Sequence, residues 1–215
     1  MKIYSKEQIP QRSDLWHKIR ANKMTASNAD RVIANGTGLK TYCYELVTEY
    51  LSQKIPEQIV NDNLLRGVLL EEQAATYCSL LTGEEWEEIG FVEVDTNVGC
   101  SPDRVIIENG KITKILEIKC PNDKNFLELI LTEEIPTKYI YQMNFQMMCC
   151  ELETCKYFAY NPNIKPYYYM EEIKADKTIQ DKLQIGLEHG KEIIKELLNE
   201  YKSKTGIKLP RLAGV

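Results

Sequence analysis

Apolar residues spaced three or four apart recur along much of the chain and predict seven helices. The predicted helices span approximately residues 14–20, 26–34, 41–54, 64–82, 124–131, 137–152 and 177–203. The stripes expected to face the core are Tyr44, Val47 and Leu51; Leu70, Ala74, Tyr77 and Leu81; and Tyr141, Phe145, Met148 and Leu152. The last helix mixes charged and apolar positions along its length, which is typical of a helix with one exposed face.

Alternating apolar positions, bounded by turn-forming residues, predict five strands between these helices. They span approximately residues 86–94, 98–107, 111–119, 155–161 and 167–174. Asn109-Gly110, between the second and third strands, predicts a hairpin. Strands interspersed with helices indicate the α/β (α+β) class, with a central mixed β-sheet flanked by helices. We expect a single domain, 1–215, with a C-terminal tail that is loosely held from about residue 206.

The predicted hairpin carries charged residues within an apolar strand. Glu117 and Lys119 lie two residues apart and point to one face, whereas Leu116 and Ile118 point to the other. Burying a charge is costly unless it is paired or binds a metal. Together with Asp103, these residues form a set that can bind a hard divalent cation and position a water. A salt bridge between Glu117 and Lys119 on a partly exposed strand is the simpler alternative.

The register of the hairpin decides whether Asp103 can join this set. A regular two-residue loop places Asp103 opposite Leu116, on the face away from Glu117. A shared metal therefore requires a three-residue loop or a β-bulge. We predict that Asp103 lies opposite or diagonal to Glu117.

Two helices that flank the hairpin carry further candidates. Glu71 lies beside the apolar stripe of helix 64–82, where a solvated position is the default interpretation. Gln142 and Gln146 lie four residues apart and therefore share one face of helix 137–152. Amide side chains suit a channel for phosphate groups, but surface glutamines are common.

The N-terminal segment combines a cation with several hydroxyl groups. Ser13 or Asp14 can cap the first helix, and Thr25 or Ser27 can cap the second. A helix start with hydroxyls and Arg20 nearby suits a phosphate group. Taken alone, the segment favours plain capping with a solvated Arg20.

The charge distribution leaves room for a local DNA-binding surface. The formal net charge of −5 at pH 7 argues against a general nucleic-acid coat. Residues 1–40 nevertheless carry eight Lys or Arg and three acids, while residues 41–108 carry three and fourteen. No apolar run reaches membrane-spanning length and no signal-peptide core is visible, so we expect a cytoplasmic protein.

These features occur in an order that resembles the lambda-exonuclease/YqaJ-type phage recombination nucleases, within the PD-(D/E)xK nuclease superfamily. The resemblance covers about residues 11–161. The matching motifs are Ser13-Asp14-Leu15-Trp16-His17-Lys18-Ile19-Arg20, Thr25-Ala26-Ser27, Gly67-x-x-x-Glu71-x-x-Ala74, Cys100-Ser101-Pro102-Asp103, Leu116-Glu117-Ile118-Lys119-Cys120-Pro121, and Gln142 with Tyr157-Phe158-Ala159. The resemblance implies a restriction-endonuclease-like core.

The resemblance also implies a metal-dependent catalytic site. Asp103 and Glu117 correspond to the main metal ligands, and the Ile118 carbonyl completes the shell of one ion. Glu71 corresponds to a residue that helps to hold the second ion or its waters. Lys119 corresponds to the residue that positions the nucleophilic water. The implied cofactor is Mg²⁺, with Mn²⁺ as an alternative, and two ions are expected per site.

The way DNA is held is a further implication of the resemblance. Gln142 corresponds to a residue that supports the site and the scissile phosphate, and Arg20 and Ser27 to residues that bind the 5′-terminal phosphate. The implied reaction digests one strand of linear double-stranded DNA 5′→3′ and leaves 3′ tails for recombination. The implied partners are DNA ends, a single-strand annealing protein and further copies of the chain in a ring-shaped homotrimer. A phage or prophage origin in a bacterial host is expected.

Two positions depart from the family pattern, where glycine often stands. Ala21 is a mild change after Arg20, whereas Arg104 places a charge next to the metal-binding Asp103. Arg104 either faces DNA or alters the turn. Metal affinity and substrate preference are therefore the properties most open to change.

Two other functions remain as alternatives. A RecB-like or CRISPR-associated nuclease with an iron–sulfur cluster needs four well-placed cysteines. Cys149, Cys150 and Cys155 are close together, but no cysteine follows Cys155. The other alternative is a non-catalytic DNA-binding module that keeps the fold, against which the intact Asp103 and Glu117 argue.

Overall fold

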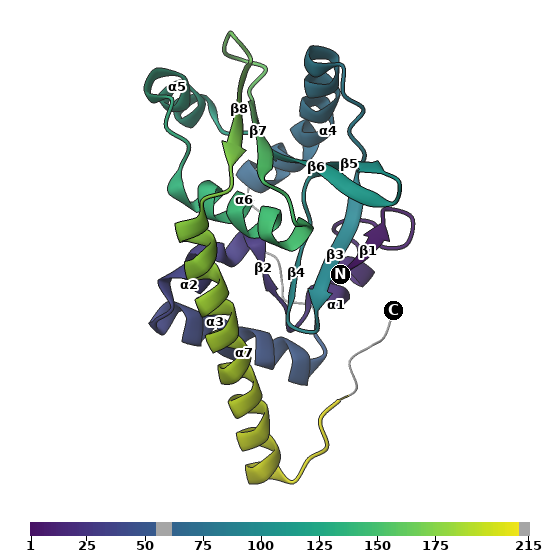
Figure 1. Cartoon of the computed structure of the whole chain (residues 1–215), viewed down its shortest axis with the longest axis vertical. Coiled ribbons are helices and arrows are strands. Elements are labelled where there is room, and N and C mark those ends of the chain that lie inside the picture. The colour runs from purple at the N-terminus through teal and green to yellow at the C-terminus, as the bar shows by residue number, and fades with distance from the viewer. Residues whose placement is uncertain (55–61, 211–215) are drawn as a thin grey trace. The chain divides into compact units, whose positions relative to one another are not determined.

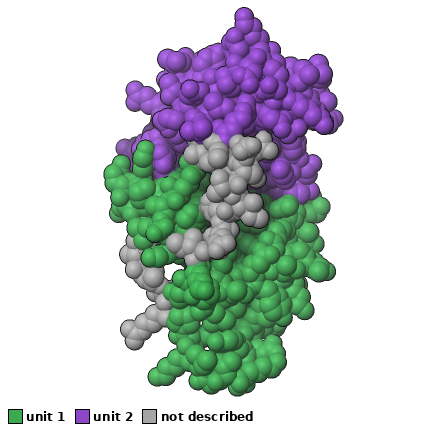
Figure 2. Space-filling view, turned by 180° about the vertical axis from the view of Figure 1, so that it is seen from behind, with its two compact units in different colours: residues 1–57, 90–101, 176–215 green, residues 58–89, 102–175 purple. Residues whose placement is uncertain are grey.

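The computed structural model describes residues 1–54 and 62–210, and its elements are shown in Figure 1. The chain divides into two compact units, which are coloured separately in Figure 2. The first unit comprises Met1–Glu57, Gly90–Ser101 and Asp176–Val215, and the second comprises Gln58–Ile89 and Pro102–Ala175. Each unit therefore combines segments that are distant in the sequence. The single domain expected over 1–215 stays a prediction.

The first unit contains a four-stranded mixed sheet with helices. Its elements are β1 Lys2–Ser5, α1 Asp14–Arg20, β2 Met24–Thr25, the 3₁₀ helix Ala26–Asn28, α2 Ala29–Ala34, α3 Thr37–Ser52, β3 Ile89–Asp95, β4 Val98–Cys100 and α7 Lys177–Thr205. The strand order is β1-β3-β4-β2, with β3 antiparallel and β2 parallel to β4.

Helix α7 packs tightly in the first unit because glycines lie on its buried face. A Cβ atom at Gly186 would lie 2.1 Å from the Val32 carbonyl oxygen, and one at Gly190 would lie 2.5 Å from the Met24 sulfur. The Gly186 contact is with backbone, which cannot move aside, so the close approach of α7 depends on that glycine. At Gly190 the flexible Met24 side chain would have to shift. Neither α7 nor any other helix among the described residues is long and apolar enough to cross a membrane.

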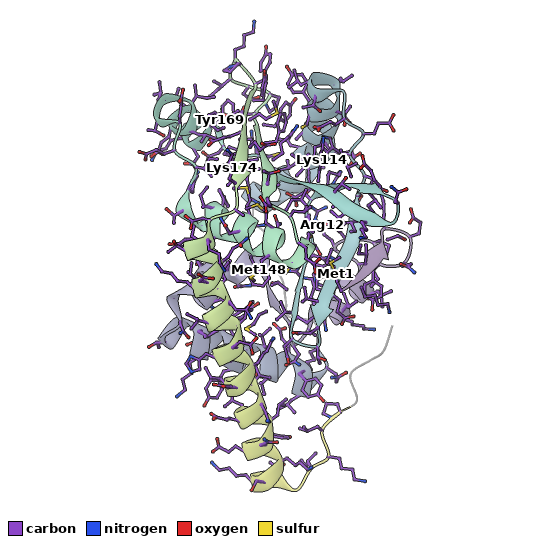
Figure 3. All side chains as sticks on the ribbon, viewed as in Figure 1. Met1, Arg12, Lys114, Met148, Tyr169 and Lys174 are labelled. Atoms are coloured by element: carbon purple, nitrogen blue, oxygen red, sulfur yellow. The ribbon has the colours of Figure 1, made fainter. Side chains whose placement is uncertain are left out.

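The second unit contains the other four-stranded mixed sheet. Its elements are α4 Asp62–Thr82, β5 Arg104–Glu108, β6 Lys111–Lys119, α5 Asp123–Thr132, α6 Thr137–Cys150, β7 Thr154–Tyr160 and β8 Tyr168–Lys174. The strand order is β5-β6-β7-β8, in which only β6 and β7 are parallel. Helices α5 and α6 supply the crossover that a parallel pair requires. Figure 3 shows the side chains, with Lys114 labelled on β6, Met148 on α6, and Tyr169 and Lys174 on β8.

Different helices cover the two faces of β6. Leu116 and Ile118 belong to an apolar cluster with Ala74 of α4. Glu117, which lies between them in the strand, receives a hydrogen bond from Gln146 of α6. The alternation of side chains along a strand explains this division, and it places the charged face towards α6.

The hairpin of β5 and β6 contains the predicted β-bulge. Its loop has two residues, and the pairing then shifts by one residue within the hairpin. Beyond the shift, Arg104 pairs with Leu116, so the preceding residue, Asp103, lies across from Glu117. The predicted placement of Asp103 is confirmed.

The predicted α/β (α+β) fold class is confirmed, but the strands form two sheets where one central sheet was expected. The predicted strand 98–107 is in fact two strands, β4 and β5, which belong to different sheets. Pro102 lies between them and has no N–H to continue a ladder. Strands β1 and β2 were not predicted, because four and two residues are too few to show an alternating pattern.

Two of the predicted core stripes are partly wrong. Tyr44 is 50% exposed and Leu81 is 41% exposed. The same helices bury the small residues Cys43 and Cys78, which allow close packing and turn the larger neighbours outward. Helix α3 also begins at Thr37, earlier than predicted.

The predicted loose tail is described only in part. Helix α7 ends at Thr205, and Gly206 after it adopts the left-handed conformation typical of a helix end. The Tyr50 hydroxyl donates a hydrogen bond to the Pro210 carbonyl oxygen. Residues 211–215 of the predicted tail lie outside the described residues.

Candidate active site

Two carboxylates and a lysine come together where β5 begins and β6 ends. The Asp103 carboxylate accepts a hydrogen bond of 2.7 Å from the Ile118 N–H. The Lys119 ammonium contacts the carboxylate of Glu117, whose side chain is fully buried. The structure thus unites the aspartate, glutamate and lysine that the sequence singled out.

Two glutamines of α6 hold the buried Glu117 carboxylate. Gln142 donates from Nε2 to one carboxylate oxygen and Gln146 donates from Nε2 to the other, each at 2.6 Å. Hydrogen bonds to an ionised group offset much of the cost of removing it from water. Gln146 shares the helix face of Gln142, as expected from their spacing, but only Gln142 was assigned a role in the site from the sequence.

The electrostatics of this site disfavour two ionised carboxylates. Burial raises the pKa of Asp103 well above its usual range, and the nearby Glu117 carboxylate raises it further. Burial lowers the pKa of Lys119, but attraction to Glu117 and Asp103 outweighs burial and raises that pKa overall. Lys119 therefore stays protonated and neutralises part of the negative charge.

The oxygen atoms of this site fit one hard divalent cation. Such cations prefer carboxylate and carbonyl oxygens, which Asp103, Glu117 and the Ile118 backbone supply. A cation would also relieve the repulsion that raises the pKa of Asp103. In the part of the chain that the structure describes, no three His, Cys, Asp or Glu side chains form a ready metal cluster. Further oxygen ligands must therefore come from the backbone or from water.

Glu71, the predicted third carboxylate, is held by an arginine. Arg104 Nη1 lies 3.1 Å from a Glu71 carboxylate oxygen, and Nη2 lies 2.5 Å from one of Glu72. Arg104 is buried, with only 5% of its side chain exposed. The position that departs from the family pattern thus contacts a predicted metal-binding residue.

The predicted phosphate-binding residues meet in the first unit. Arg20 stacks on the Trp16 ring, 4.0 Å from its centroid, and its Nη2 lies 3.4 Å from the hydroxyls of both Thr25 and Ser27. Burial lowers the pKa of the Arg20 guanidinium. Arg20 is therefore not the freely solvated side chain that the segment alone suggested.

Of the two capping predictions for this segment, one is confirmed and the other is wrong. Ser13 caps α1 by accepting a hydrogen bond from the Trp16 N–H, as predicted. Thr25 makes no such capping bond to the 3₁₀ helix that follows it. Helix α2 starts after Asn28 instead, so the prediction that Thr25 or Ser27 caps a regular helix is wrong. The hydroxyls contact Arg20 rather than a helix end.

Comparison with known protein families identifies the family of this chain. Residues 15–153 match the YqaJ-like viral recombinase domain. The chain belongs to this family. The matched region contains every side chain predicted for the site, so the resemblance seen in the sequence motifs is confirmed.

Solved structures resemble this YqaJ-like chain over most of its length. An alkaline exonuclease from Laribacter hongkongensis, LHK-Exo, is 26% identical, with a TM-score of 0.80 over 90% of this chain and 98% of that chain. The same protein in complex with dAMP gives a TM-score of 0.81 at the same identity and coverage. A phage-related exonuclease from Haemophilus somnus 129PT, 14% identical, gives 0.64 over 86% and 99% of the two chains, and shows the fold alone. No curated protein matches the chain.

The family and the likeness to LHK-Exo support a nuclease of the alkaline exonuclease type. The iron–sulfur alternative gains no support from the cysteines. All seven are free thiols, and all but Cys120 are buried. The described residues hold no three-residue cluster in which cysteines could bind a metal.

Proposed function

We propose that this YqaJ-like chain is a metal-dependent exonuclease that digests one strand of linear double-stranded DNA 5′→3′ and leaves 3′ single-stranded tails for recombination. The observation that carries the proposal is the buried Glu117 carboxylate, which Lys119 and two glutamines hold across from Asp103. A salt bridge between Glu117 and Lys119 alone would not need the Asp103 carboxylate across from it. A site that binds a divalent cation beside a phosphate group does need a second carboxylate.

Each residue of the site has a distinct part in this proposal. Asp103, Glu117 and the Ile118 carbonyl hold the cation, Mg²⁺ or alternatively Mn²⁺. When bound, the cation supplies Lewis acidity and lowers the pKa of an attacking water. Lys119 orients that water, because its ammonium is fixed beside Glu117. Gln142 holds the Glu117 carboxylate in one orientation and so keeps its free lone pairs aimed at the cation.

The direction of digestion rests on the Arg20 site. A guanidinium with two hydroxyls beside it offers several donors to the three oxygens of a terminal phosphate. Ser27 is exposed, so its hydroxyl is accessible to such a group. We propose that Arg20 and Ser27 bind the 5′-phosphate of the strand being digested.

The wider assembly is also part of the proposal. A processed 3′ tail needs a protein that takes it up, which suits a single-strand annealing partner. A ring-shaped homotrimer on double-stranded DNA ends suits digestion that starts at an end. Membership of the YqaJ-like family supports these expectations, and a phage or prophage origin in a bacterial cytoplasm is part of the same proposal.

A comparison of linear with covalently closed circular DNA tests the nuclease assignment. In Mg²⁺, wild type should degrade the linear duplex and spare the circle, and a chelator should stop the reaction. Lys119→Ala should bind the duplex but not cut it. Lys111→Ala, at an exposed position on the same strand, is the matched control and should cut normally. Loss of the circle points to an endonuclease, and no loss of either points to the non-catalytic module.

A second comparison tests the phosphate site. Wild type should digest 5′-phosphorylated ends faster than 5′-hydroxyl ends. Arg20→Ala should remove most of that preference, while Mn²⁺ binding in the absence of DNA stays unchanged. Lys18→Ala removes an exposed charge from the same helix and should keep the preference. Equal rates on both ends for wild type would count against the assigned role of Arg20.

A further inference from the structure

Arg104 is a buried cation with three partners in the second unit. Its Nη1 donates to Glu71 at 3.1 Å and to the Asp103 carbonyl at 2.6 Å, and its Nη2 donates to Glu72 at 2.5 Å. Only 5% of the Arg104 side chain is exposed, and 13% of the Glu71 side chain. A charge buried to this degree depends on its partners, because water cannot replace them.

The strand geometry explains why Arg104 reaches Glu71. Arg104 pairs with Leu116 across the hairpin, and Leu116 packs against α4. Side chains alternate along a strand, so Arg104 points towards α4 while Asp103 and Glu117 share the opposite face. Glu71 belongs to α4, and the guanidinium meets its carboxylate there. The Glu71 charge still helps to raise the pKa of Asp103, so Glu71 lies within electrostatic range of the cation site.

Two consequences follow for Glu71 as a ligand. Its carboxylate is already neutralised by a fixed cation, so a second metal ion would have to compete with the guanidinium. Releasing Glu71 would also leave Arg104 buried with one fewer anionic partner, and breaking a buried ion pair is strongly unfavourable.

We propose that Arg104 occupies the Glu71 carboxylate and so limits the site to one tightly bound divalent ion, held by Asp103, Glu117 and the Ile118 carbonyl. This inference rests on the proposed function, since it concerns the cation of the same nuclease site. It differs from the expectation of two ions. Arg104 is here a positioning residue, because it acts on Glu71 and touches neither DNA nor the ion.

Counting bound Mn²⁺ on the whole chain without DNA tests this inference. The loss of the free-ion signal in electron paramagnetic resonance, together with calorimetric titration, gives the number of ions and their affinities. Wild type should bind one Mn²⁺ tightly. Arg104→Gly should bind a second ion with at least tenfold higher affinity than any second ion of wild type. Arg104→Lys keeps a cation at this position and should resemble wild type.

Two further variants show whether Glu71 is the ligand that is released. Glu71→Gln alone should still bind one ion, and Glu71→Gln combined with Arg104→Gly should return from two ions to one. Because glycine can loosen a strand, Arg104→Gln provides the same removal of charge with a full side chain. Circular dichroism establishes that each variant is folded. If Arg104 only stabilises the fold, Arg104→Gly and Arg104→Gln should be less stable than wild type but should bind no additional Mn²⁺.

The outcomes separate this inference from the function on which it rests. Two tight ions in wild type, or no second ion in either folded Arg104→Gly or Arg104→Gln, would overturn the role of Arg104. Neither result would touch the nuclease assignment, which digestion of linear DNA measures independently. No Mn²⁺ bound to wild type at all would instead overturn the proposed cation site, and the inference with it.

Discussion

Replacing Asp103 with asparagine should stabilise the metal-free protein and abolish its response to metal. Burial and the neighbouring Glu117 raise the pKa of Asp103 in the folded protein. An acid whose folded pKa is raised costs stability as the pH rises from its unfolded pKa through its folded pKa. At neutral pH that cost is present, and a neutral amide removes it. The asparagine oxygen can still accept the Ile118 N–H bond.

The size of the effect follows from the arrangement of the charges. Two like charges about 4 Å apart repel by about 4 kcal/mol at an effective dielectric constant of about 20. Lys119 lies beside Glu117 and offsets part of this, so we expect Asp103→Asn to add about 1–3 kcal/mol. For a chain of this length, about 1 kcal/mol moves the Tm by about 2–4 °C. The metal-free variant should therefore melt about 2–12 °C above wild type.

Magnesium should reverse the order of the two proteins. At about one thousand times its Kd, a ligand that binds only the folded state adds about 4.1 kcal/mol of stability, which exceeds the advantage of the variant. Wild type should gain this stabilisation in Mg²⁺, whereas Asp103→Asn should gain little or none. Thermal unfolding followed by circular dichroism, with chelator and then with Mg²⁺, measures both effects. Asp123→Asn is the control: hydrogen bonds from Asn161 and Asn163 lower the pKa of Asp123, so removing its charge should not raise the Tm.

A lower Tm for Asp103→Asn in chelator would refute the reasoning about charge repulsion. An equal shift of both proteins by Mg²⁺ would show that the ion binds elsewhere. Either result would leave the fold unaffected, because neither the register of the hairpin nor the Ile118 hydrogen bond depends on the charge of Asp103.

Further predictions concern stability. Gln146→Leu should lower the free energy of unfolding by about 1–2 kcal/mol in chelator, measured by urea titration, because the buried Glu117 loses a charge-assisted hydrogen bond. The loss is moderated because the Gln146 amide oxygen has no partner of its own. Gly186→Ala should cost about 1–3 kcal/mol, because its Cβ would meet the Val32 carbonyl. Gly38→Ala, in open space within α3, should stabilise by about 0.4–1 kcal/mol, and an equal effect of both glycine substitutions on Tm would contradict the packing of α7.

The arrangement of side chains on the β5–β6 hairpin could be predicted from the sequence because it follows a short-range rule. Side chains alternate along a strand, so Glu117 and Lys119 had to share a face. The bulge followed from chemistry rather than from pattern: without it, Asp103 would have pointed away from Glu117. The structure shows that shift in pairing.

Contacts between distant segments could not be predicted. The partners of Arg104 lie on α4, more than thirty residues earlier, and no local pattern connects them. The contacts of Arg20 with Thr25 and Ser27 likewise depend on the turn after α1, which no periodic pattern specifies. The division of strand 98–107 was visible in principle, since Pro102 lies inside it, but its assignment to two sheets depends on tertiary packing.

Digestion of a strand-labelled duplex tests the central claim most directly. The strand to be digested begins with a 5′-phosphate and is labelled at its 3′ end, and the complementary strand begins with a 5′-hydroxyl and carries a different label at its own 3′ end. In Mg²⁺ the account predicts that labelled fragments shorten steadily from the 5′ end while the complementary strand stays intact. Chelator and Lys119→Ala should both abolish the shortening. Shortening from the 3′ end, cuts in both strands, or digestion that survives Lys119→Ala would contradict the account.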